Sequence, residues 1–262
     1  MTVAQLACSR SGHGERIVLL HGFTQTSRSW SRIAERLAPD HEVVAIDLPG
    51  HAGSSEVRID LVESATSIAE AAGPGPAVIV GYSLGGRHAL HVALQHPQIV
   101  RALVLVGATA GIEDPTERSL RRASDERLAE QLLDTGVEEF LAQWLAGPLF
   151  ASLTAEATDV EDRLRNSAEG LAASLRLAGT GVQQNLWPRL GELRMPVLLV
   201  AGEHDEKFTA LGRRMAAVIG ADAEFELVPG AGHSVHLEQP GPFGDRLVEF
   251  LHRIEAASPG GS

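Results

Sequence analysis

Residues 81–86 read Gly-Tyr-Ser-Leu-Gly-Gly, and this short stretch decides the fold. An apolar run, Ala77 to Val80, precedes it, and a helical pattern, Leu84 to His96, follows it. Glycines two residues before and two residues after Ser83 let a strand reverse into a helix without side-chain collisions, which leaves the hydroxyl exposed at the turn. The stretch therefore predicts a nucleophilic serine at a strand-turn-helix junction. The alternative is a glycine-rich structural turn.

Short apolar runs rich in Val, Ile and Leu recur on both sides of that stretch, with helical patterns between them. This alternation predicts a mostly parallel sheet covered by helices on both faces, an α/β fold. The expected strands are Ile17 to Leu20, Val43 to Asp47, Ala77 to Val80, Ala102 to Val106, Val197 to Ala201 and Glu224 to Val228. The expected helices are Trp30 to Leu37, Leu61 to Ala72, Leu84 to His96, Ala210 to Ile219 and Pro242 to Glu255.

The strand signal disappears between residues 111 and 188, where charged, Leu-rich helical stretches take over. These stretches are Ser124 to Leu133, Val137 to Trp144 and Leu171 to Ala178. They predict a helical insertion, residues 111–188, that folds as a lid over the strand ends, where open α/β sheets bind ligands. The core would then comprise residues 1–110 and 189–255, and residues 256–262 would form a disordered tail.

Length and charge exclude several classes of protein. With 262 residues, 44% of them hydrophobic, the chain can close one large core, and its net charge of −12 disfavours nucleic acid and acidic membrane surfaces as partners. No apolar run approaches the ~20 residues of a membrane-spanning helix, and Met1 to Ser11 lacks the features of a signal peptide, so a cytoplasmic location is expected.

The single cysteine, Cys8, cannot form an internal disulfide and is expected to be buried. The oligomeric state is left open.

Two later segments supply an acid and a base for the serine. Asp205 comes just after the strand that ends at Ala201, and His233 lies in a glycine-rich loop that starts at Gly230. In the chain order serine, acid, histidine, Asp205 would orient the His233 ring, and His233 would accept the Ser83 proton. Weaker candidates are Glu203 for the acid and His204 or His236 for the base, whereas His88, His91 and His96 are expected to be structural.

An oxyanion formed beside Ser83 needs two fixed hydrogen-bond donors. One is expected to be the backbone N–H of Leu84 at the start of the helix. Phe23 would supply the second from the loop after the first expected strand. In that loop, His21 is expected to form structural hydrogen bonds rather than to act as the base.

The sequence indicates neither a metal site nor a nucleotide cofactor. No pair of histidines has the helical H-E-x-x-H spacing, and the glycine-rich turns lack both the P-loop lysine and the G-x-G-x-x-G pattern. We therefore expect no metal and no cofactor.

The chain resembles the α/β-hydrolase superfamily over essentially its whole length. Within that superfamily it is most similar to the 2-succinyl-6-hydroxy-2,4-cyclohexadiene-1-carboxylate synthase family of menaquinone biosynthesis. The stretches that carry this resemblance are LHGFTQT (residues 20–26), DLPGHAGS (47–54), GYSLGGR (81–87), WLAGPLFASL (144–153) and GEHDEKF (202–208), with Ser124-Asp125 and the loop that starts at Gly230. The resemblance implies a lyase in which the activated serine removes a substrate proton and pyruvate is eliminated without consumption of water.

The resemblance further implies a small substrate with three carboxylates, which an enclosed pocket would bind through cations. It assigns the carboxylates to Arg87, Arg121, Arg165 and Lys207, with Arg118 as a weaker candidate, and it places Tyr82 and Trp144 in the pocket wall. The residues by themselves leave alternatives open. The i,i+4 spacings of Glu117 to Arg121 and of Arg122 to Glu126 also fit surface ion pairs on a solvated helix. The same triad would serve a serine hydrolase of small esters, thioesters or carbon-carbon bonds, and a third alternative is a ligand receptor that kept the fold.

Overall fold

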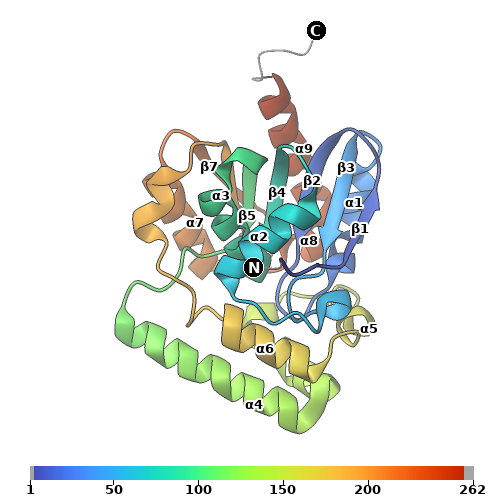
Figure 1. The fold of residues 1–262 in the computed structure, drawn as a ribbon, viewed down its shortest axis with the longest axis vertical. Coiled ribbons are helices and arrows are strands. Elements are labelled where there is room, and N and C mark those ends of the chain that lie inside the picture. Colours follow the sequence, from blue (N-terminus) through green and yellow to red (C-terminus); the bar gives the residue numbers. More distant parts are fainter. Residues whose placement is uncertain (1–2, 257–262) are drawn as a thin grey trace.

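The computed structural model describes residues 3–256, which form a seven-stranded sheet covered by helices (Figure 1). Across the sheet the strands follow the order β1-β3-β2-β4-β5-β6-β7; β1 is antiparallel to β3, and all other neighbours are parallel. The strands are β1 (Cys8–Ser11), β2 (Glu15–Leu20), β3 (His41–Ile46), β4 (Ala77–Tyr82), β5 (Val100–Val106), β6 (Val197–Gly202) and β7 (Ala223–Val228). The predicted α/β architecture is confirmed.

Both faces of the sheet are buried, which is why its strands read as continuous apolar runs. Successive side chains of a strand point to opposite faces, so in β2 Val18 and Leu20 join one hydrophobic core while Ile17 and Leu19 join the other. Helices α2 (Leu61–Ala72), α3 (Leu84–Gln95) and α7 (Glu206–Ile219) contribute to the first core. Helices α1 (Ser31–Leu37), α8 (Val235–Glu238) and α9 (Pro240–Ala256) contribute to the second.

The direction in which the chain proceeds across the sheet reverses between β2 and β4. From β2 the chain continues to β3 on one side, and from β4 it continues to β5 on the other. Open α/β sheets bind ligands at such a switch point, outside the carboxyl ends of the strands. Ser83 follows β4 at this point.

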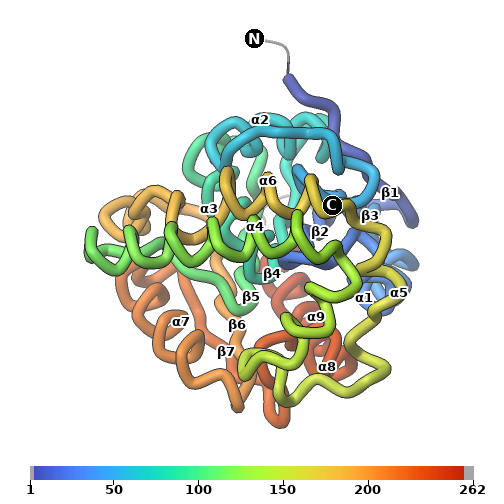
Figure 2. Tube along the Cα trace, turned by 90° about the horizontal axis from the view of Figure 1, so that it is seen from below, coloured from blue at the N-terminus to red at the C-terminus, as the bar shows by residue number. Residues whose placement is uncertain are grey.

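The helical insertion lies across that end of the sheet. Its helices are α4 (Pro115–Leu145), α5 (Val160–Arg163) and α6 (Ala168–Ala178). Figure 1 shows α4 and α6 side by side beyond the strands, and Figure 2 looks onto them from below. They share a small core of their own, made of Ala129, Leu132, Phe140, Leu171, Ala172 and Leu175. Trp144 of α4 packs against this core, and so does Phe23 from the loop after β2, which joins the insertion to the rest of the protein.

Several local expectations were wrong. Cys8 is exposed rather than buried, and it begins the edge strand β1, whose four residues are all exposed and give no apolar signal. Asp47 lies beyond β3, where its carboxylate accepts hydrogen bonds from the Ser27 and Gly53 N–H groups. Trp30 ends a short 3-10 helix instead of beginning an α-helix.

The two helices expected near residues 124–144 are joined into α4, which is interrupted by the non-helical backbone of Gly136 (φ 78°). Of the expected disordered tail, residues 256–262, Ala256 ends α9 and the others lie outside the described residues. No helix between residues 3 and 256 combines the length and apolar character that a membrane span needs.

Gly85 should be required for the packing of α3 onto β2. A Cβ at this position would lie 2.1 Å from the Leu20 carbonyl oxygen, so the backbone would have to shift. We expect Gly85→Ala to lower the free energy of unfolding by about 3 kcal/mol. Gly191 is exposed with nothing within 4 Å of its added Cβ, and Gly191→Ala, the control, should change that free energy by less than ~0.5 kcal/mol. Urea denaturation measures both, and equal effects would contradict the proposed close approach.

Candidate active site

Ser83 occupies the turn between β4 and α3 with φ 51° and ψ −105°. Such a backbone costs a non-glycine residue of order 1–3 kcal/mol and is found mainly at functional sites. The Ser83 N–H donates to the Val106 carbonyl oxygen at 2.8 Å, which ties the turn to β5. A Cβ on Gly81 would lie 2.4 Å from the Gly85 carbonyl oxygen, so this tight reversal requires glycine there.

Asp205, His233 and Ser83 form a continuous hydrogen-bonded chain. Nδ1 of His233 lies 2.6 Å from Oδ2 of Asp205, and Nε2 of His233 lies 3.2 Å from Oγ of Ser83. Asp205 follows β6 and caps α7, where its Oδ1 accepts the Phe208 N–H at 3.2 Å. The acid and the base are both buried, with 8% and 2% of their surface exposed. With Nδ1 donating to the carboxylate, Nε2 is free to accept the serine proton.

The weaker candidates for acid and base occupy other positions. Glu203 is exposed and accepts the Gly230 N–H at 2.8 Å, and His204 is also exposed. His236 is stacked on Trp30, with ring centroids 4.2 Å apart. Within residues 3–256, no three His, Cys, Asp or Glu side chains are grouped so that they could hold a metal ion.

The residues expected to supply the oxyanion donors, Phe23 and Leu84, line the same cavity as Ser83. Leu84 is the first residue of α3, so its N–H has no partner one turn earlier in the helix. Gly85 brings this helix end against the carbonyl groups of Leu20 and His21, from which the chain continues to Phe23. Phe23, Ser83 and Leu84 all line one cavity. The structure therefore brings both expected donor residues to the cavity of Ser83, and their role as oxyanion donors stays a prediction.

His21 holds the loop that carries Phe23, as predicted. Its Nδ1 lies 2.8 Å from the Gly22 carbonyl oxygen, and its Nε2 accepts the Leu48 N–H at 3.0 Å. With Nε2 accepting, Nδ1 carries the hydrogen and donates to Gly22. Burial lowers the pKa of His21 to about 4, so the ring is neutral at neutral pH.

The cavity beside Ser83 has a volume of about 130 Å³ and gathers three cations. Arg87 comes from α3, Arg121 from α4 and Lys207 from α7. Its wall also contains Phe23, Trp144, Leu149, Leu175 and Phe208, with Thr109, Ser174 and Thr180. The structure therefore brings Arg87, Arg121, Lys207 and Trp144 together around Ser83 and His233.

Arg87 is a buried cation that forms no ion pair with a carboxylate of residues 3–256. Only 7% of its surface is exposed, and its guanidinium donates to the Ala178 carbonyl oxygen. Burial, together with repulsion from Arg121, lowers the pKa of Arg87 to about 9, so the side chain stays protonated at neutral pH. Among the ion pairs of residues 3–256, none involves Arg87 or Lys207. A buried unpaired charge is costly, and an anionic ligand would remove that cost.

Asp125 is a residue of the site that sequence reasoning did not assign. It is 2% exposed, accepts from Nε of Arg121 at 2.7 Å and also accepts the Gly181 N–H at 3.2 Å. Arg121 thus pairs with the carboxylate four residues after it rather than with Glu117 four residues before it. Nor does Glu126 pair with Arg122, because it binds Arg176 instead. The sequence feature that could have indicated Asp125 is its position four residues after Arg121. Such i,i+4 spacing does not distinguish a buried partner from an exposed one.

Three residues expected at the substrate lie outside the lining of this cavity. The Tyr82 ring is buried against His233, and its hydroxyl lies 2.9 Å from Oγ of Ser234. Arg165 lines a separate hollow of about 660 Å³, with its Nε 3.7 Å from Oδ1 of Asp162. Arg118 is half-buried on α4 and lines neither hollow.

Comparison with known proteins assigns the chain to a family. The alpha/beta hydrolase fold family matches residues 15–240. The chain belongs to the α/β-hydrolase fold family. This confirms the resemblance inferred from the sequence.

Relatives within the family carry a more specific name. A 2-succinyl-6-hydroxy-2,4-cyclohexadiene-1-carboxylate synthase from Citrobacter koseri is 33% identical over 90% of this chain and 93% of its own. A Bacillus subtilis protein that bears the same name provisionally is 40% identical over 92% of this chain and 91% of its own. The solved structure of MenH from S. aureus superimposes with a TM-score of 0.88 at 31% identity, covering 96% of this chain and 99% of that one.

Buried histidines should make the protein less stable as the pH falls below neutrality. Burial lowers the pKa of His88 and His236 well below 6.5, and their ring nitrogens have no hydrogen-bond partner. Below pH 6.5 the unfolded chain binds protons at these sites while the folded chain does not. The free energy of unfolding therefore decreases as the pH is lowered. Each such histidine contributes a slope of up to about 1.4 kcal/mol per pH unit.

Urea denaturation between pH 7.5 and pH 5 measures this slope. His88→Leu should flatten it, because one buried site that cannot take up a proton is removed. The exposed His13, replaced by Leu, is the matched control and should leave the slope as it is. A wild-type slope in His88→Leu would contradict the account.

Proposed function

We propose that this protein is a lyase that eliminates pyruvate from 2-succinyl-5-enolpyruvyl-6-hydroxy-3-cyclohexene-1-carboxylate. The product would be 2-succinyl-6-hydroxy-2,4-cyclohexadiene-1-carboxylate, the compound after which its relatives are named. The observation that carries the proposal is the buried Arg87, which forms no ion pair within the described residues 3–256 and lines the same cavity as Ser83 and His233. A neutral ester would not satisfy this cation, whereas a carboxylate would.

The proposed substrate has three carboxylates, and the cavity offers three cations. Arginine matches a carboxylate with two parallel hydrogen bonds, which suits Arg87 and Arg121, and Lys207 supplies a point charge. Asp125 already holds Nε of Arg121, which leaves the terminal nitrogens of that guanidinium for the ligand. Arg118 and Arg165 are not needed, because neither lines this cavity.

The hydrogen-bonded chain supports removal of a substrate proton. His233 would take the Ser83 proton, the serine oxygen would then abstract a proton from the substrate ring, and Asp205 would stabilise the charged imidazole. The electron pair left on carbon forms the new ring double bond as the carbon–oxygen bond to the enolpyruvyl group breaks. Pyruvate leaves as its enolate, which takes up the proton held on His233; this returns the imidazole to its neutral form, and no water is consumed. The Phe23 and Leu84 N–H groups would stabilise negative charge that develops on oxygen beside Ser83.

Loss of the serine hydroxyl should abolish turnover. We expect the wild-type protein to release pyruvate from the enolpyruvyl substrate while diene absorbance appears, and Ser83→Ala to lower kcat by at least ~1,000-fold. A coupled pyruvate assay together with the absorbance change measures both. If folded wild-type protein releases no pyruvate but shows an acylation burst with activated esters, the alternative serine hydrolase is the correct function.

Arg121 should distinguish an anionic substrate from a neutral one. Arg121→Ala should lower kcat/KM for the tricarboxylate by about 100-fold or more, because a desolvated charge pair is lost. Arg122 is the matched control, since it is exposed on the same helix and does not line the cavity. Arg122→Ala should change kcat/KM by less than about twofold. Equal effects of the two substitutions would show that Arg121 does not bind the substrate.

A further inference from the structure

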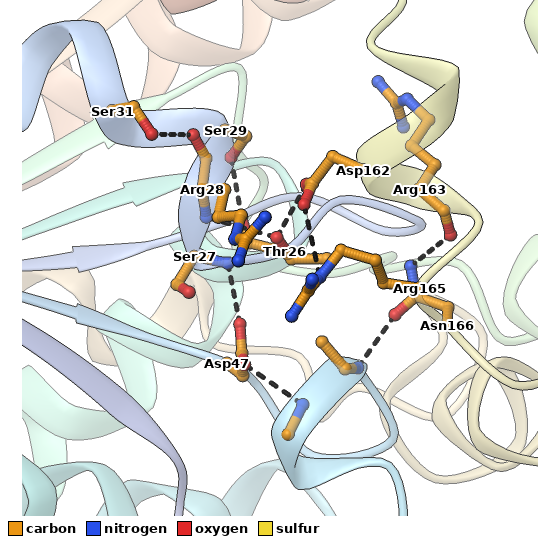
Figure 3. A network of polar contacts seen from close by, with 12 residues as sticks. Thr26, Ser27, Arg28, Ser29, Ser31, Asp47, Asp162, Arg163, Arg165 and Asn166 are labelled. Atoms are coloured by element: carbon orange, nitrogen blue, oxygen red, sulfur yellow. Dashed lines mark hydrogen bonds and ion pairs between the residues drawn. The ribbon is translucent and has the colours of Figure 1, made fainter.

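The loop that carries Phe23, residues 21–26, is held from outside by the helical insertion. Oγ1 of Thr26 donates to Oδ2 of Asp162 at 2.6 Å, and the guanidinium of Arg163 donates to Oγ1 of Thr24. Nδ2 of Asn166 donates to the carbonyl oxygen of Thr24 at 2.8 Å. Figure 3 shows Asp162, Arg163 and Asn166 on one segment of the insertion, beside Thr26. Three side chains of that segment therefore fix the loop directly after Phe23.

Asn166 differs from Asp162 and Arg163 because its side chain binds two loops at once. Its Oδ1 accepts the Ala52 N–H at 3.0 Å, and Nδ2 donates a second hydrogen bond to the Arg163 carbonyl oxygen at 2.9 Å. Only 6% of the residue is exposed. Both hydrogens of the amide group are used, and all three partners are backbone groups. The Thr24 carbonyl and the Ala52 N–H belong to loops outside the insertion, whereas the Arg163 carbonyl belongs to the insertion itself.

Both loops that Asn166 binds carry a strained residue at the point of contact. Thr24 has φ 67° and Ala52 has φ 39°, in the left-handed region that residues with a Cβ avoid. A β-branched residue such as Thr24 persists there only if its surroundings hold it. The Thr24 carbonyl oxygen and side chain are the groups that Asn166 and Arg163 bind.

We propose that Asn166 is a positioning residue that fixes the Phe23 N–H beside Ser83 by holding Thr24 in its left-handed conformation. This proposal rests on the proposed function, in which the Phe23 N–H stabilises negative charge during the reaction. The helical insertion then does more than cover the site, because it completes the arrangement of the donors. Catalytic donors of this kind act only when they are held in place before the reaction begins.

Asn166→Asp tests the proposal with little change in size. A carboxylate cannot donate to the Thr24 and Arg163 carbonyl groups, and it places negative charge against both. We expect kcat for pyruvate release to fall 10- to 100-fold with KM within about threefold, since substrate carboxylates are bound elsewhere. Asn166→Ala, which removes the hydrogen bonds without adding repulsion, should have a smaller effect, and it carries the test if the Asp variant does not fold.

Ser167→Ala is the matched control. Ser167 is the next residue of the same segment and caps α6 by accepting the Gly170 N–H; among the hydrogen bonds of residues 3–256, none joins it to the 21–26 loop. It should reduce stability while leaving kcat within about twofold of wild type. An equal loss of kcat in Ser167→Ala and in the Asn166 variants would reduce Asn166 to a structural role and overturn the proposal.

Amide hydrogen exchange separates this proposal from the proposed function, because it needs no substrate. Both Asn166 variants should exchange faster than wild type in peptides that cover residues 21–27, and the Ser167 variant should not. If the wild type releases no pyruvate, the proposed reaction is wrong while the exchange result still decides the role of Asn166. If residues 21–27 exchange in the Asn166 variants at the same rate as in the wild type, the positioning role of Asn166 is wrong.

Discussion

The reversal of the chain at Ser83 is possible only because α3 approaches β2 at backbone contact distance. Gly85 lies so close to the end of β2 that a Cβ there would overlap the Leu20 carbonyl oxygen, and Gly81 faces the carbonyl of Gly85 in the same way. This approach has a second consequence. The chain leaves β2 beside the first turn of α3, so the loop with Phe23 meets the helix end with Leu84. One close contact thus allows the tight turn at Ser83 and brings Phe23 and Leu84 to the cavity that Ser83 lines.

The electrostatics of the cavity are opposite to those of the whole chain. The protein carries a net charge of −12, yet Arg87, Arg121 and Lys207 gather around the candidate site from three separate helices. Asp125 offsets one of these three charges through its ion pair with Arg121 and also accepts the Gly181 N–H, so the group keeps a net positive charge. That pair joins α4 to the chain after α6, so a binding cation and the packing of the insertion depend on the same carboxylate. The charge of the cavity is therefore coupled to the position of the insertion.

Sequence reasoning predicted the features that local pattern determines and missed those that packing determines. The strands buried on both faces were recognisable as apolar runs, and the order of Ser83, Asp205 and His233 followed from their loops. Edge strand β1 was missed because its residues are exposed and polar apart from Cys8. Arg121 has carboxylates four residues away in both directions, and only the packing of α4 against α6 selects Asp125. For Arg165 the resemblance assigned a substrate carboxylate, whereas the fold of the insertion places the residue in the lining of a separate hollow.

The fold and the triad do not by themselves decide between a hydrolase and a lyase, since the same three side chains can attack a carbonyl carbon or remove a proton. What differs between the two reactions is the charge that the site has to bind. Arg87 is held in a buried position with backbone and cavity around it and no carboxylate partner, and its lowered pKa reflects the cost of that burial. A site for neutral esters would gain nothing from keeping such a residue, because the cost would persist in the complex. An anionic substrate removes the cost when it binds, so the unpaired arginine favours the tricarboxylate lyase over the esterase.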